Sequence, residues 1–219
     1  MHPARIAELL APFLDPANDH QLTTNDLADI STYIDILLRW NARMNLTAIR
    51  DPDEVVTRHF GESLFAARQL LPRPTHLGTV ANHVSVADVG SGAGFPGLPI
   101  KLWAPHISLT LIESNLKKAT FLREVTRALS LTDVNIRNIR AETLAGDTFD
   151  LVTLRAVESF ETILPVATNL VSPAGRLALL IGAAQMDPAR SALPQFSWSD
   201  PEPIPVSRNR ILAVSHRLL

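Results

Sequence analysis

The stretch from Val84 to Leu98, VSVADVGSGAGFPGL, constrains the fold of this chain more than any other part of it. Its β-branched start predicts a strand, and its end is compatible with the start of a helix. Four glycines lie between them: Gly90, Gly92, Gly94 and Gly97. Because glycine adopts positive φ and carries no Cβ, such a turn lets the backbone approach a nucleotide-like ligand closely. The helix N-terminus is expected to add free N–H groups and a partial positive charge.

Two ligand-binding patterns match these glycines. Gly92-x-Gly94-x-x-Gly97 is the dinucleotide pattern, whereas Asp88-x-Gly90-x-Gly92-x-Gly94 is typical of S-adenosylmethionine (SAM) methyltransferases. A turn that binds no ligand is the third alternative. Glu113 lies 21 residues after Gly92 and directly follows the next predicted strand, 108–112. An acidic residue in that place accepts hydrogen bonds from ribose hydroxyls, which favours a ribose-bearing cofactor.

Composition narrows the class of protein. With 219 residues, 46% of them hydrophobic and 19% charged, the chain suits one folded α/β domain with a small extra piece. No apolar run approaches the roughly 18 residues that cross a bilayer, and the N-terminus lacks the layout of a secretion signal. We therefore expect a cytoplasmic protein without membrane contact. The absence of cysteine, of HExxH and of paired histidines predicts no disulfide and no metal site.

The chain before the glycine-rich stretch is predicted to be helical. Apolar residues at spacings of three and four predict helices over residues 3–14 and 24–44. A third helix is expected to begin at Asp51, with Pro52 at its first position and Glu54 completing a capping box.

Two pairs of polar residues on these helices each allow two roles. Arg39 and Arg43 are four residues apart, and they form either a solvated helix face or a contact with RNA. Arg58 and His59 lie near the middle of the third helix, where His59 is either a structural residue or a catalytic one.

Residues 71–83 are predicted to form a loop that separates a helical N-terminal region, 1–70, from an α/β domain, 71–219. In that domain, strands are expected at 108–112, 134–139, 149–154, 176–181 and 211–216, the fourth of these after a turn at Gly175. Helices are expected at 116–129 and 163–170. A proline-rich segment from 188 to 205 is expected to be irregular. Alternating strands and helices predict a parallel-rich sheet covered on both faces.

Candidate ligand contacts follow the predicted strands. Parallel sheets bind ligands at the carboxyl ends of their strands. Gly90, Glu113, Glu142 and Arg155 all lie just past such an end. We therefore expect these four residues to lie close together.

Basic residues gather after the second strand of the domain. The formal net charge is −2, so a contact with nucleic acid requires a local basic patch. Between Ser114 and Arg140 there are six basic residues and only two acidic ones. The basic residues are Lys117, Lys118, Arg123, Arg127, Arg137 and Arg140. They form either a phosphate-contacting face or the solvated helix face of an ordinary enzyme.

Five blocks of the chain together resemble one family. The blocks are RWNARMNLTAIRDPDEVVTRHFGES, VADVGSGAGFPGLPI, ESNLKKATFLREV, IRAETL and LRAV, in that order between about residues 30 and 181. They resemble the small-subunit ribosomal RNA methyltransferase G family, also called the glucose-inhibited division protein B family. The WN-x-x-x-NLT pattern, together with the RH pair, is much more specific to this family than the glycine-rich turn.

The resemblance implies a Rossmann-like α/β methyltransferase fold with a small helical N-terminal extension. It implies a SAM-dependent enzyme that methylates N7 of one guanine in 16S rRNA, near the decoding centre of the small ribosomal subunit. We expect a monomer that contacts the RNA through a local basic face: Lys117, Lys118, Arg123 and Arg127.

The resemblance also implies roles for single residues. Gly90 and Gly92 would meet the cofactor, Phe95 would line its pocket, and Glu113 would bind the ribose. Ala141 and Glu142 fall at the adenine end. Arg155 falls beside the methyl donor and the target, as a candidate for positioning the substrate and as a cofactor contact.

The chain departs from the family pattern at several places. Leu154 replaces the usual serine before the arginine, and Ile181-Gly182 replaces a usual Lys-Gly, which removes a positive charge near the substrate cleft. The 71–83 loop is longer than expected, and cysteine is absent.

The chemistry of the implied reaction agrees with the residues present. N7 of guanine carries an exposed lone pair, so no proton has to be removed and no general base is required. Stacking of Phe95 or Arg155 on the presented base is a hypothesis. The alternatives are a SAM-dependent methyltransferase with a different RNA or small-molecule substrate, an NAD-dependent oxidoreductase, and an RNA-binding module without activity.

Overall fold

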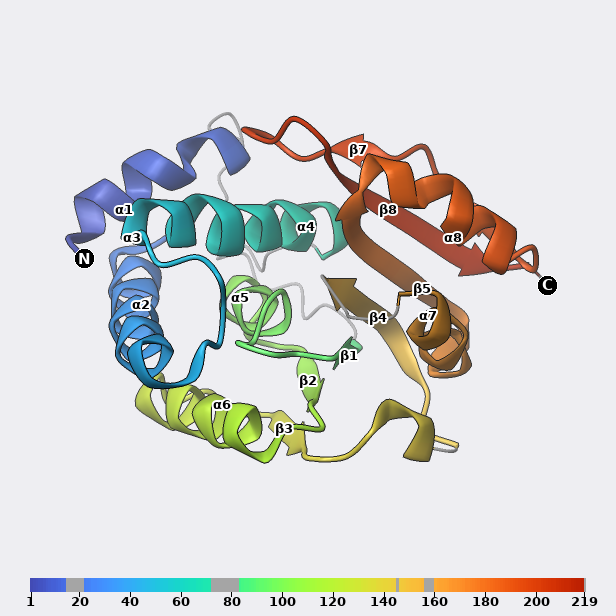
Figure 1. The fold of residues 1–219 in the computed structure, drawn as a ribbon, viewed down its shortest axis with the longest axis horizontal. Coiled ribbons are helices and arrows are strands. Elements are labelled where there is room, and N and C mark those ends of the chain that lie inside the picture. Colours follow the sequence, from blue (N-terminus) through green and yellow to red (C-terminus); the bar gives the residue numbers. More distant parts are fainter. Residues whose placement is uncertain (15–21, 72–82, 145, 156–159, 219) are drawn as a thin grey trace.

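The computed structural model describes residues 1–14, 22–71, 83–144, 146–155 and 160–218. In these residues, eight strands form one sheet in the order β3-β2-β1-β4-β5-β8-β6, with β7 paired to β8 (Figure 1). The strands are β1 Ser85–Val89, β2 Ser108–Ile112, β3 Val134–Arg137, β4 Phe149–Arg155, β5 Val171–Gly182, β6 Phe196–Trp198, β7 Glu202–Pro203 and β8 Arg210–Arg217. Strands β1 to β5 pair in parallel, and the last three strands are antiparallel to their neighbours at the β5 edge.

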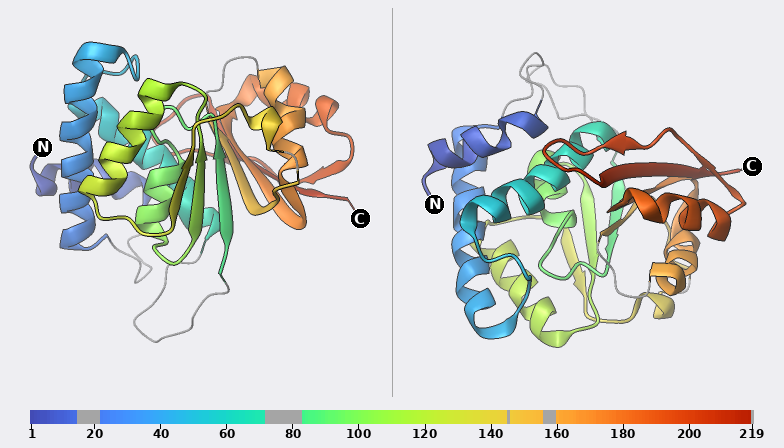
Figure 2. Two further views of the ribbon diagram at one scale, coloured as in Figure 1. Left: turned by 90° about the horizontal axis from the view of Figure 1, so that it is seen from below. Right: turned by 45° about the horizontal axis from the view of Figure 1, so that its top comes forward.

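Helices cover both faces of the sheet (Figure 2). One face carries the helices of the first half of the chain: α1 Pro3–Leu10, η1 Ala11–Phe13, α2 Thr24–Met44, α3 Pro52–Glu54, the π-helix η2 Val55–Gly61, α4 Glu62–Leu70, α5 Gly97–Trp103 and α6 Leu116–Ala128. The other face carries η3 Ala141–Thr143, α7 Phe160–Asn169, η4 Ala183–Gln185 and α8 Met186–Ala192. The predicted parallel-rich sheet with two covered faces is therefore confirmed.

The two faces of the sheet belong to two separate cores. Successive side chains of a strand point to opposite faces, so neighbours in sequence enter different cores. Val86 packs with the helices of the first half of the chain, whereas Ala87, the next residue, packs with α7 and α8. Leu151 and Val152 divide in the same way on β4. Because the middle strands are buried on both faces, their central residues are mostly apolar rather than alternating, and Asp88 and Thr153 are buried polar exceptions.

The N-terminal helices begin and end largely where the sequence predicts. Helix α2 spans residues 24–44, is capped by a box between Thr23 and Asp26, and ends at Asn45 in the left-handed conformation, with φ 47°. Asp51 caps the next helix, since its Oδ1 accepts the Glu54 N–H at 2.9 Å.

The helical stretch over residues 52–70 contains a π-helical segment that the spacing of apolar residues does not predict. It ends at Gly61, where a Cβ would come within 2.5–2.7 Å of the Phe13 ring. The segment is therefore shaped by a tertiary contact with η1.

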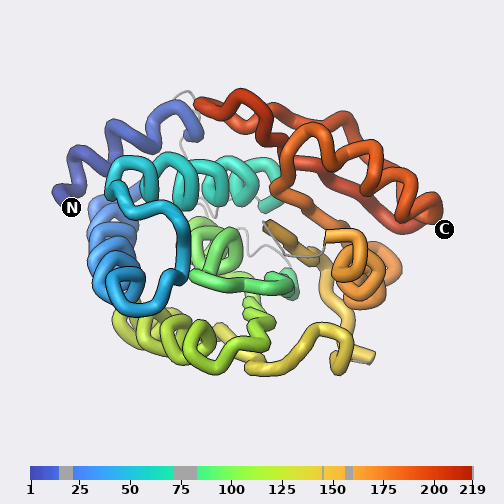
Figure 3. The backbone as a smooth tube through the Cα atoms, viewed as in Figure 1, coloured from blue at the N-terminus to red at the C-terminus, as the bar shows by residue number. Residues whose placement is uncertain are grey.

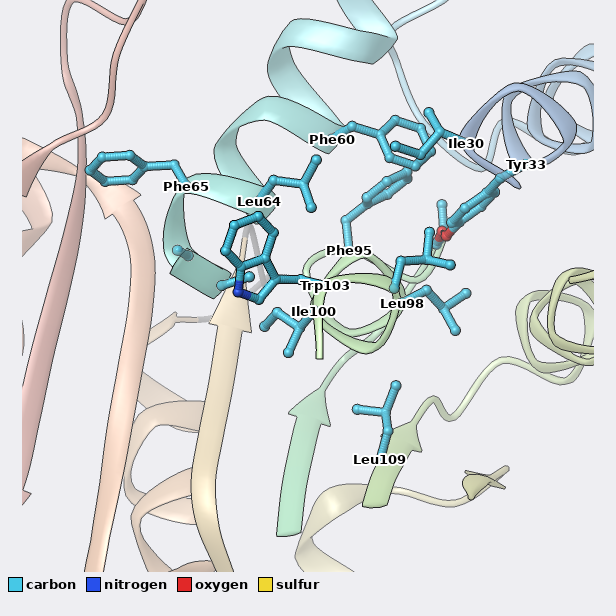
Figure 4. Close-up of a cluster of buried hydrophobic side chains, with 14 of the residues drawn as sticks. Ile30, Tyr33, Phe60, Leu64, Phe65, Phe95, Leu98, Ile100, Trp103 and Leu109 are labelled. Carbon is cyan, nitrogen blue, oxygen red and sulfur yellow. The ribbon is translucent and has the colours of Figure 1, made fainter. Parts of the chain in front are cut away.

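An aromatic cluster ties α2 and η2 to the glycine-rich turn (Figure 4). The Phe95 ring stacks on Tyr33 at 5.3 Å between centroids and meets the Phe60 ring edge-on at 5.1 Å. The Tyr33 hydroxyl donates to the backbone oxygen of Ala93 at 2.5 Å. The N-terminal helices thus pack directly on the turn that follows β1.

The predicted turn at Gly175 is wrong. Strand β5 already begins at Val171, and Gly175 lies inside it. The register with β4 shifts between Phe149 and Leu151, so the extra residues of β5 form an irregular bulge. A Cβ at position 175 would come within 2.7 Å of the Phe149 carbonyl oxygen, which explains glycine there.

The proline-rich segment from 188 to 205 was predicted to be irregular, and this prediction is wrong. The segment contains most of α8 and the strands β6 and β7. Pro188 lies in the first turn of α8, where a backbone N–H has no partner within the helix. Pro203 lies in the two-residue strand β7, which pairs with β8 alone, and an edge strand tolerates proline. The predicted loop falls mostly on residues 72–82, which lie outside the described residues.

The backbone trace places the two ends of the chain at opposite sides of the molecule (Figure 3). Between them, the segment after α2 runs beside the glycine-rich turn. Among the described residues, no helix has the length and apolar character needed to span a membrane.

Candidate functional site

The glycine-rich turn folds back over the end of β2. The N–H groups of Gly90 and Ser91 both donate to the carbonyl oxygen of Ile112, at 2.9 and 3.1 Å. Gly90, Gly92 and Gly94 have positive φ values of 69°, 56° and 88°, as predicted for this turn. Only glycine adopts this conformation at little cost, so the turn keeps its backbone close to the strand ends.

The helix N-terminus after the turn does not present free N–H groups, so that expectation is wrong. The Gly97 N–H donates to Asp88 Oδ2 at 3.3 Å, the Leu98 N–H donates to the Gly94 oxygen at 2.8 Å, and Pro99 has no N–H. Asp88 is 1% exposed, and Thr153 also donates to it at 2.9 Å. Burial raises the pKa of Asp88 to about 6, although the bonds from Thr153 and Gly97 act in the opposite direction.

A first cavity, of about 430 Å³, lies at the carboxyl ends of β1, β2 and β3. We call it the acidic cavity, and it is lined by Val89, Gly90, Ile112, Glu113, Ser114, Ile139, Arg140, Ala141, Glu142 and Ile163. The structure thus brings together Gly90, Glu113 and Glu142, three of the four residues that were expected to lie close together, and it places Ala141 beside them. The fourth, Arg155, does not line this cavity.

Glu113 is positioned by backbone N–H groups on both sides. Its Oε2 accepts the Gly92 N–H at 2.8 Å, and its Oε1 accepts the Asn115 N–H at 2.7 Å. The Asn138 amide donates to the backbone oxygens of Glu113 and Ser114, at 2.8 and 3.0 Å. A carboxylate accepts about four hydrogen bonds, so Glu113 retains acceptor capacity for the hydroxyls of a ligand.

A second cavity, of about 510 Å³, lies on the other side of Gly90. We call it the arginine cavity, and it is lined by Leu46, Thr47, Ala48, Ile49, Arg58, His59, Gly90, Ser91, Gly92, Ala93, Phe95, Lys118, Arg155 and Arg210. Phe95 and Arg155 therefore lie in this cavity and not with Glu113. Gly90 lines both cavities.

One buried carboxylate organises the arginine cavity. Glu62 is 1% exposed, and its Oε1 lies 3.2 Å from Arg58 Nε. Its Oε2 lies 3.3 Å from Arg155 Nη2 and 3.1 Å from Arg210 Nη2. No described residue accepts from the buried Nε of Arg155 or of Arg210. Three guanidinium groups therefore share one carboxylate, and the cluster keeps an excess of positive charge.

Arg155 is the most buried of these guanidinium groups. Its Nη2 also donates to the Arg58 carbonyl oxygen at 2.5 Å, and its side chain is 7% exposed. Burial lowers the pKa of Arg155 to about 10, while the nearby Glu62 carboxylate raises it. The guanidinium carbon lies 5.9 Å from the centre of the Phe95 ring. Arg155 is thus held in place and still charged at neutral pH.

His59 is a buried neutral residue in the same wall. Its Nε2 lies 2.8 Å from Thr47 Oγ1, and its ring stacks on Phe95 at 4.6 Å between centroids. Burial, and then the positive charge of Arg155, lower the pKa of His59 to about 3. Because Tyr33 and His59 both stack on Phe95, stacking of Phe95 on a substrate base would require one of them to leave.

The sequence analysis missed two residues of this cluster, Glu62 and Arg210. Glu62 lies in a helix whose other buried residues are mostly apolar, and its spacing of four from Arg58 was the available signal. Arg210 pairs with Gly182 on β5 and offered no such signal. Ile181, at the position of the usual lysine, is 3% exposed and packs in the core on the α7 side.

The basic residues of the predicted face do not stay together. Lys117, Arg123 and Arg127 are exposed on α6, whereas Lys118 lines the arginine cavity. Of the two further along the chain, Arg137 lies 3.5 Å from Asp147 and Arg140 lines the acidic cavity. No group of three or more metal-ligating side chains occurs among the described residues.

Solved structures resemble this fold at low sequence identity. Ribosomal protein L11 methylase from Lactobacillus delbrueckii subsp. bulgaricus superposes with a TM-score of 0.59 and 16% identity, over 74% of this chain and 79% of that one. Precorrin-6y C5,15-methyltransferase from Geobacter metallireducens GS-15 gives a TM-score of 0.51 and 13% identity, over 70% and 84%. The expected Rossmann-like methyltransferase fold is therefore confirmed.

Relatives named ribosomal RNA small subunit methyltransferase G align with much of the sequence. The protein from Xylella fastidiosa (strain 9a5c) is 42% identical over 152 residues, which are 69% of this chain and 66% of that protein. The protein from Chloroflexus aggregans is 39% identical over 167 residues, 74% of this chain and 64% of that protein. The aligned part thus spans slightly less than two thirds of these two relatives.

A longer alignment joins the chain to a relative of the same name from Xanthomonas campestris pv. campestris (strain B100). It has 34% identity over 194 residues, which are 87% of this chain and 86% of that protein. A family model described as rRNA small subunit methyltransferase G, or GidB, matches residues 26–206. Since this match covers most of the sequence, the chain belongs to the rRNA small subunit methyltransferase G family.

Proposed function

We propose that this protein transfers the methyl group of SAM to N7 of one guanine of 16S rRNA, near the decoding centre of the small ribosomal subunit. It does so in the cytoplasm, as a monomer. The observation that carries the proposal is the pair of cavities that meet at Gly90, one lined by carboxylates and one by guanidinium groups. Membership of the rRNA methyltransferase family supports the choice of reaction and substrate.

The acidic cavity fits the nucleoside part of SAM. The Glu113 carboxylate is held at the end of β2 with acceptor capacity for ribose hydroxyls. Ala141 and Glu142 would take the adenine end, and the backbone of Gly90 permits close approach, while Gly92 lines the arginine cavity on the other side of the turn. When bound, SAM supplies an electrophilic methyl group on a positively charged sulfur.

The arginine cavity fits the other half of the reaction, because its residues are suited to orient rather than to move protons. N7 of guanine attacks with its own lone pair, so no general base is needed. His59, in the wall of this cavity, stays neutral at pH 7 and is bonded to Thr47. Asp88 does not line the cavity, and it is bonded to Thr153 and the Gly97 N–H. The residues that line the arginine cavity would therefore contribute to catalysis by aligning the reactants and excluding water.

Arg155 is the residue that we expect to position the target. Its guanidinium is fixed by Glu62 and by the Arg58 carbonyl, at the end of β4. Residues 46–49, Arg58 and His59 line the same cavity as Arg155, so the helical N-terminal region, 1–70, would complete the site of the catalytic domain, 71–219. The exposed α6 residues Lys117, Arg123 and Arg127 would contact RNA phosphates beside it.

Methyl transfer from tritiated SAM tests the proposal. The acceptor is small-subunit particles, or 16S rRNA, from a strain that lacks this enzyme, and the modified base is then mapped. We expect label on a single N7-methylated guanine near the decoding centre. Binding of labelled SAM without label in any RNA would assign a different substrate, and binding of labelled NAD instead of SAM would contradict the whole proposal.

A further inference from the structure

A third concave surface lies outside both cavities, between the last turns of α2 and the middle of α6. It has a volume of about 260 Å³ and is lined by Arg39, Trp40, Arg43, Met44 and Glu124. We call it the Trp40 groove. The two helices lie side by side in Figure 1, on the opposite side of the molecule from α8.

The indole of Trp40 is held in a fixed orientation. Its Nε1 donates to Glu124 Oε2 at 2.9 Å, and its ring meets the Phe121 ring at 5.7 Å between centroids and an angle of 69°. The side chain is only partly buried, so part of its surface faces the groove beside Met44. A rigid aromatic surface with an adjacent thioether is well suited to bind a flat apolar group.

The charge at the rim of the groove is positive. Glu124 is already occupied, since it accepts from Trp40 and forms an ion pair with Arg39 at 2.8 Å. Arg43 is exposed and makes no ion pair or hydrogen bond with any residue in the described part of the chain. Arg123 and Arg127 are exposed on the same helix as Glu124. A ligand that combines a flat ring with negative charge complements this surface.

The groove is close to the arginine cavity along both helices that form it. Helix α2 runs directly into residues 46–49, which line that cavity, and Lys118 lines it from the first turn of α6. From Lys118 to Glu124 the axis of α6 rises about 9 Å. A polymer in the arginine cavity therefore needs only a few residues of its length to reach the groove.

We propose that the Trp40 groove binds an unstacked nucleotide of the RNA substrate, close to the nucleotide that enters the arginine cavity. Its base lies against the indole, and its phosphate lies against Arg43. The inference rests on the proposed function, because it requires RNA as the substrate. Stacking on an aromatic side chain accepts any base, and arginine contacts to phosphate set the position of the strand without reading its sequence.

Arg43→Glu tests the phosphate contact, and Arg190→Glu is its matched control. Both arginines are exposed on helices, and Arg190 lies on α8 at the far side of the molecule. Affinity for 16S rRNA that lacks the modification is measured by filter binding at several salt concentrations, together with affinity for SAM. We expect Arg43→Glu to weaken RNA binding by about 10-fold and to reduce the salt dependence by roughly one phosphate contact. Arg190→Glu should match the wild type, and SAM affinity should be unchanged in both.

Tryptophan fluorescence tests the stacking contact. The wild type is expected to lose emission when 16S rRNA is added, and Trp40→Phe is expected to lose this response. Trp103 is 1% exposed, and the partly buried Trp198 lies in β6, at the opposite edge of the sheet from β3 and α6. Both therefore serve as internal references for Trp40.

The outcomes separate the two proposals. In one outcome the wild type methylates 16S rRNA, Arg43→Glu binds the RNA like the wild type, and Trp40 is not quenched. The groove then has no part in RNA binding, and the proposed function stands. If the wild type neither binds nor methylates any RNA, the proposed function fails and this inference fails with it.

Discussion

The acidic cavity and the arginine cavity share Gly90 but are assembled in different ways. The acidic cavity is built from the ends of three neighbouring parallel strands, and its carboxylate Glu113 is bonded to backbone N–H groups nearby. The arginine cavity is built from η2, α4, β4 and β8, which meet on the side chain of Glu62. Changes in the first should therefore alter ligand binding, whereas changes in the second should also alter the stability of the fold.

Among the substitutions that test this difference, Glu62→Gln is expected to change the free energy of unfolding most. The substitution leaves three guanidinium groups without the carboxylate that they share, and loss of one partner of a buried ion pair costs about 3–5 kcal/mol. Chemical denaturation at pH 7 measures the free energy of unfolding. The matched variant Glu142→Gln removes an exposed carboxylate of the acidic cavity and should stay within about 0.5 kcal/mol of the wild type. Equally small losses in the two variants would mean that Glu62 does not hold the arginine cavity together.

Gly94→Ala and Gly92→Ala compare a crowded position of the glycine-rich turn with an open one. Both glycines have positive φ, which costs an alanine about 1–2 kcal/mol. At position 94 a Cβ would also overlap the Tyr33 hydroxyl and lie 2.6 Å from Leu98 Cδ1, and such overpacking costs about 1–3 kcal/mol more. At position 92 the nearest atom is 3.8 Å away. We expect Gly94→Ala to be the less stable variant in thermal and chemical denaturation, and equal stabilities would contradict the packing of the turn against α2.

Asp88 and His59 are expected to change the stability of the fold with pH in opposite directions. The pKa of Asp88 is raised to about 6, so the folded state holds the proton more tightly and stability falls as pH rises from about 4 to about 6. The pKa of His59 is lowered to about 3, so the unfolded state holds the proton more tightly and stability falls as pH drops from about 6.5 towards 3. In the wild type the two effects oppose each other between pH 4 and 6.

Two variants expose these opposing slopes. Relative to the wild type, Asp88→Asn should gain stability with rising pH between 4 and 6, by about 1.4 kcal/mol per pH unit. His59→Gln should show the opposite relative slope over the same range. Urea denaturation of the three proteins at closely spaced pH values measures the difference. Parallel curves for wild type and His59→Gln would show that the histidine is not held neutral in the arginine cavity.

Glu113→Gln is expected to act mainly on cofactor binding. It also lowers stability, by less than Glu62→Gln, because one oxygen becomes an NH2 group and either the Gly92 or the Asn115 N–H loses its acceptor. Loss of charge-assisted hydrogen bonds to ribose hydroxyls should weaken SAM binding by about 10- to 100-fold, since such bonds contribute roughly 1.5–3 kcal/mol. Isothermal titration calorimetry measures the affinity. Glu161→Gln, which changes an exposed carboxylate in the first turn of α7, is the control and should bind SAM like the wild type. Unchanged affinity in Glu113→Gln would remove the ribose contact from the proposed site.

The sequence alone determined the parts of this protein that depend on short stretches of chain. The strand and glycine-rich turn, the position of Glu113, the bounds of α2 and the cap at Asp51 all follow from local spacing, backbone freedom and capping. For the same reason the acidic cavity was predictable, because parallel strands deliver their ends to one edge of a sheet.

Only the tertiary structure decided how the arginine cavity is built. Glu62 is 148 residues from Arg210, and Arg58 is 97 residues from Arg155, so no local pattern joins them. The π-helical segment that carries Arg58 and His59, and the partnering of the α5 N-terminus by Asp88, likewise depend on packing. Local sequence sets backbone conformation, but the pairing of buried charges depends on which surfaces the whole fold brings into contact.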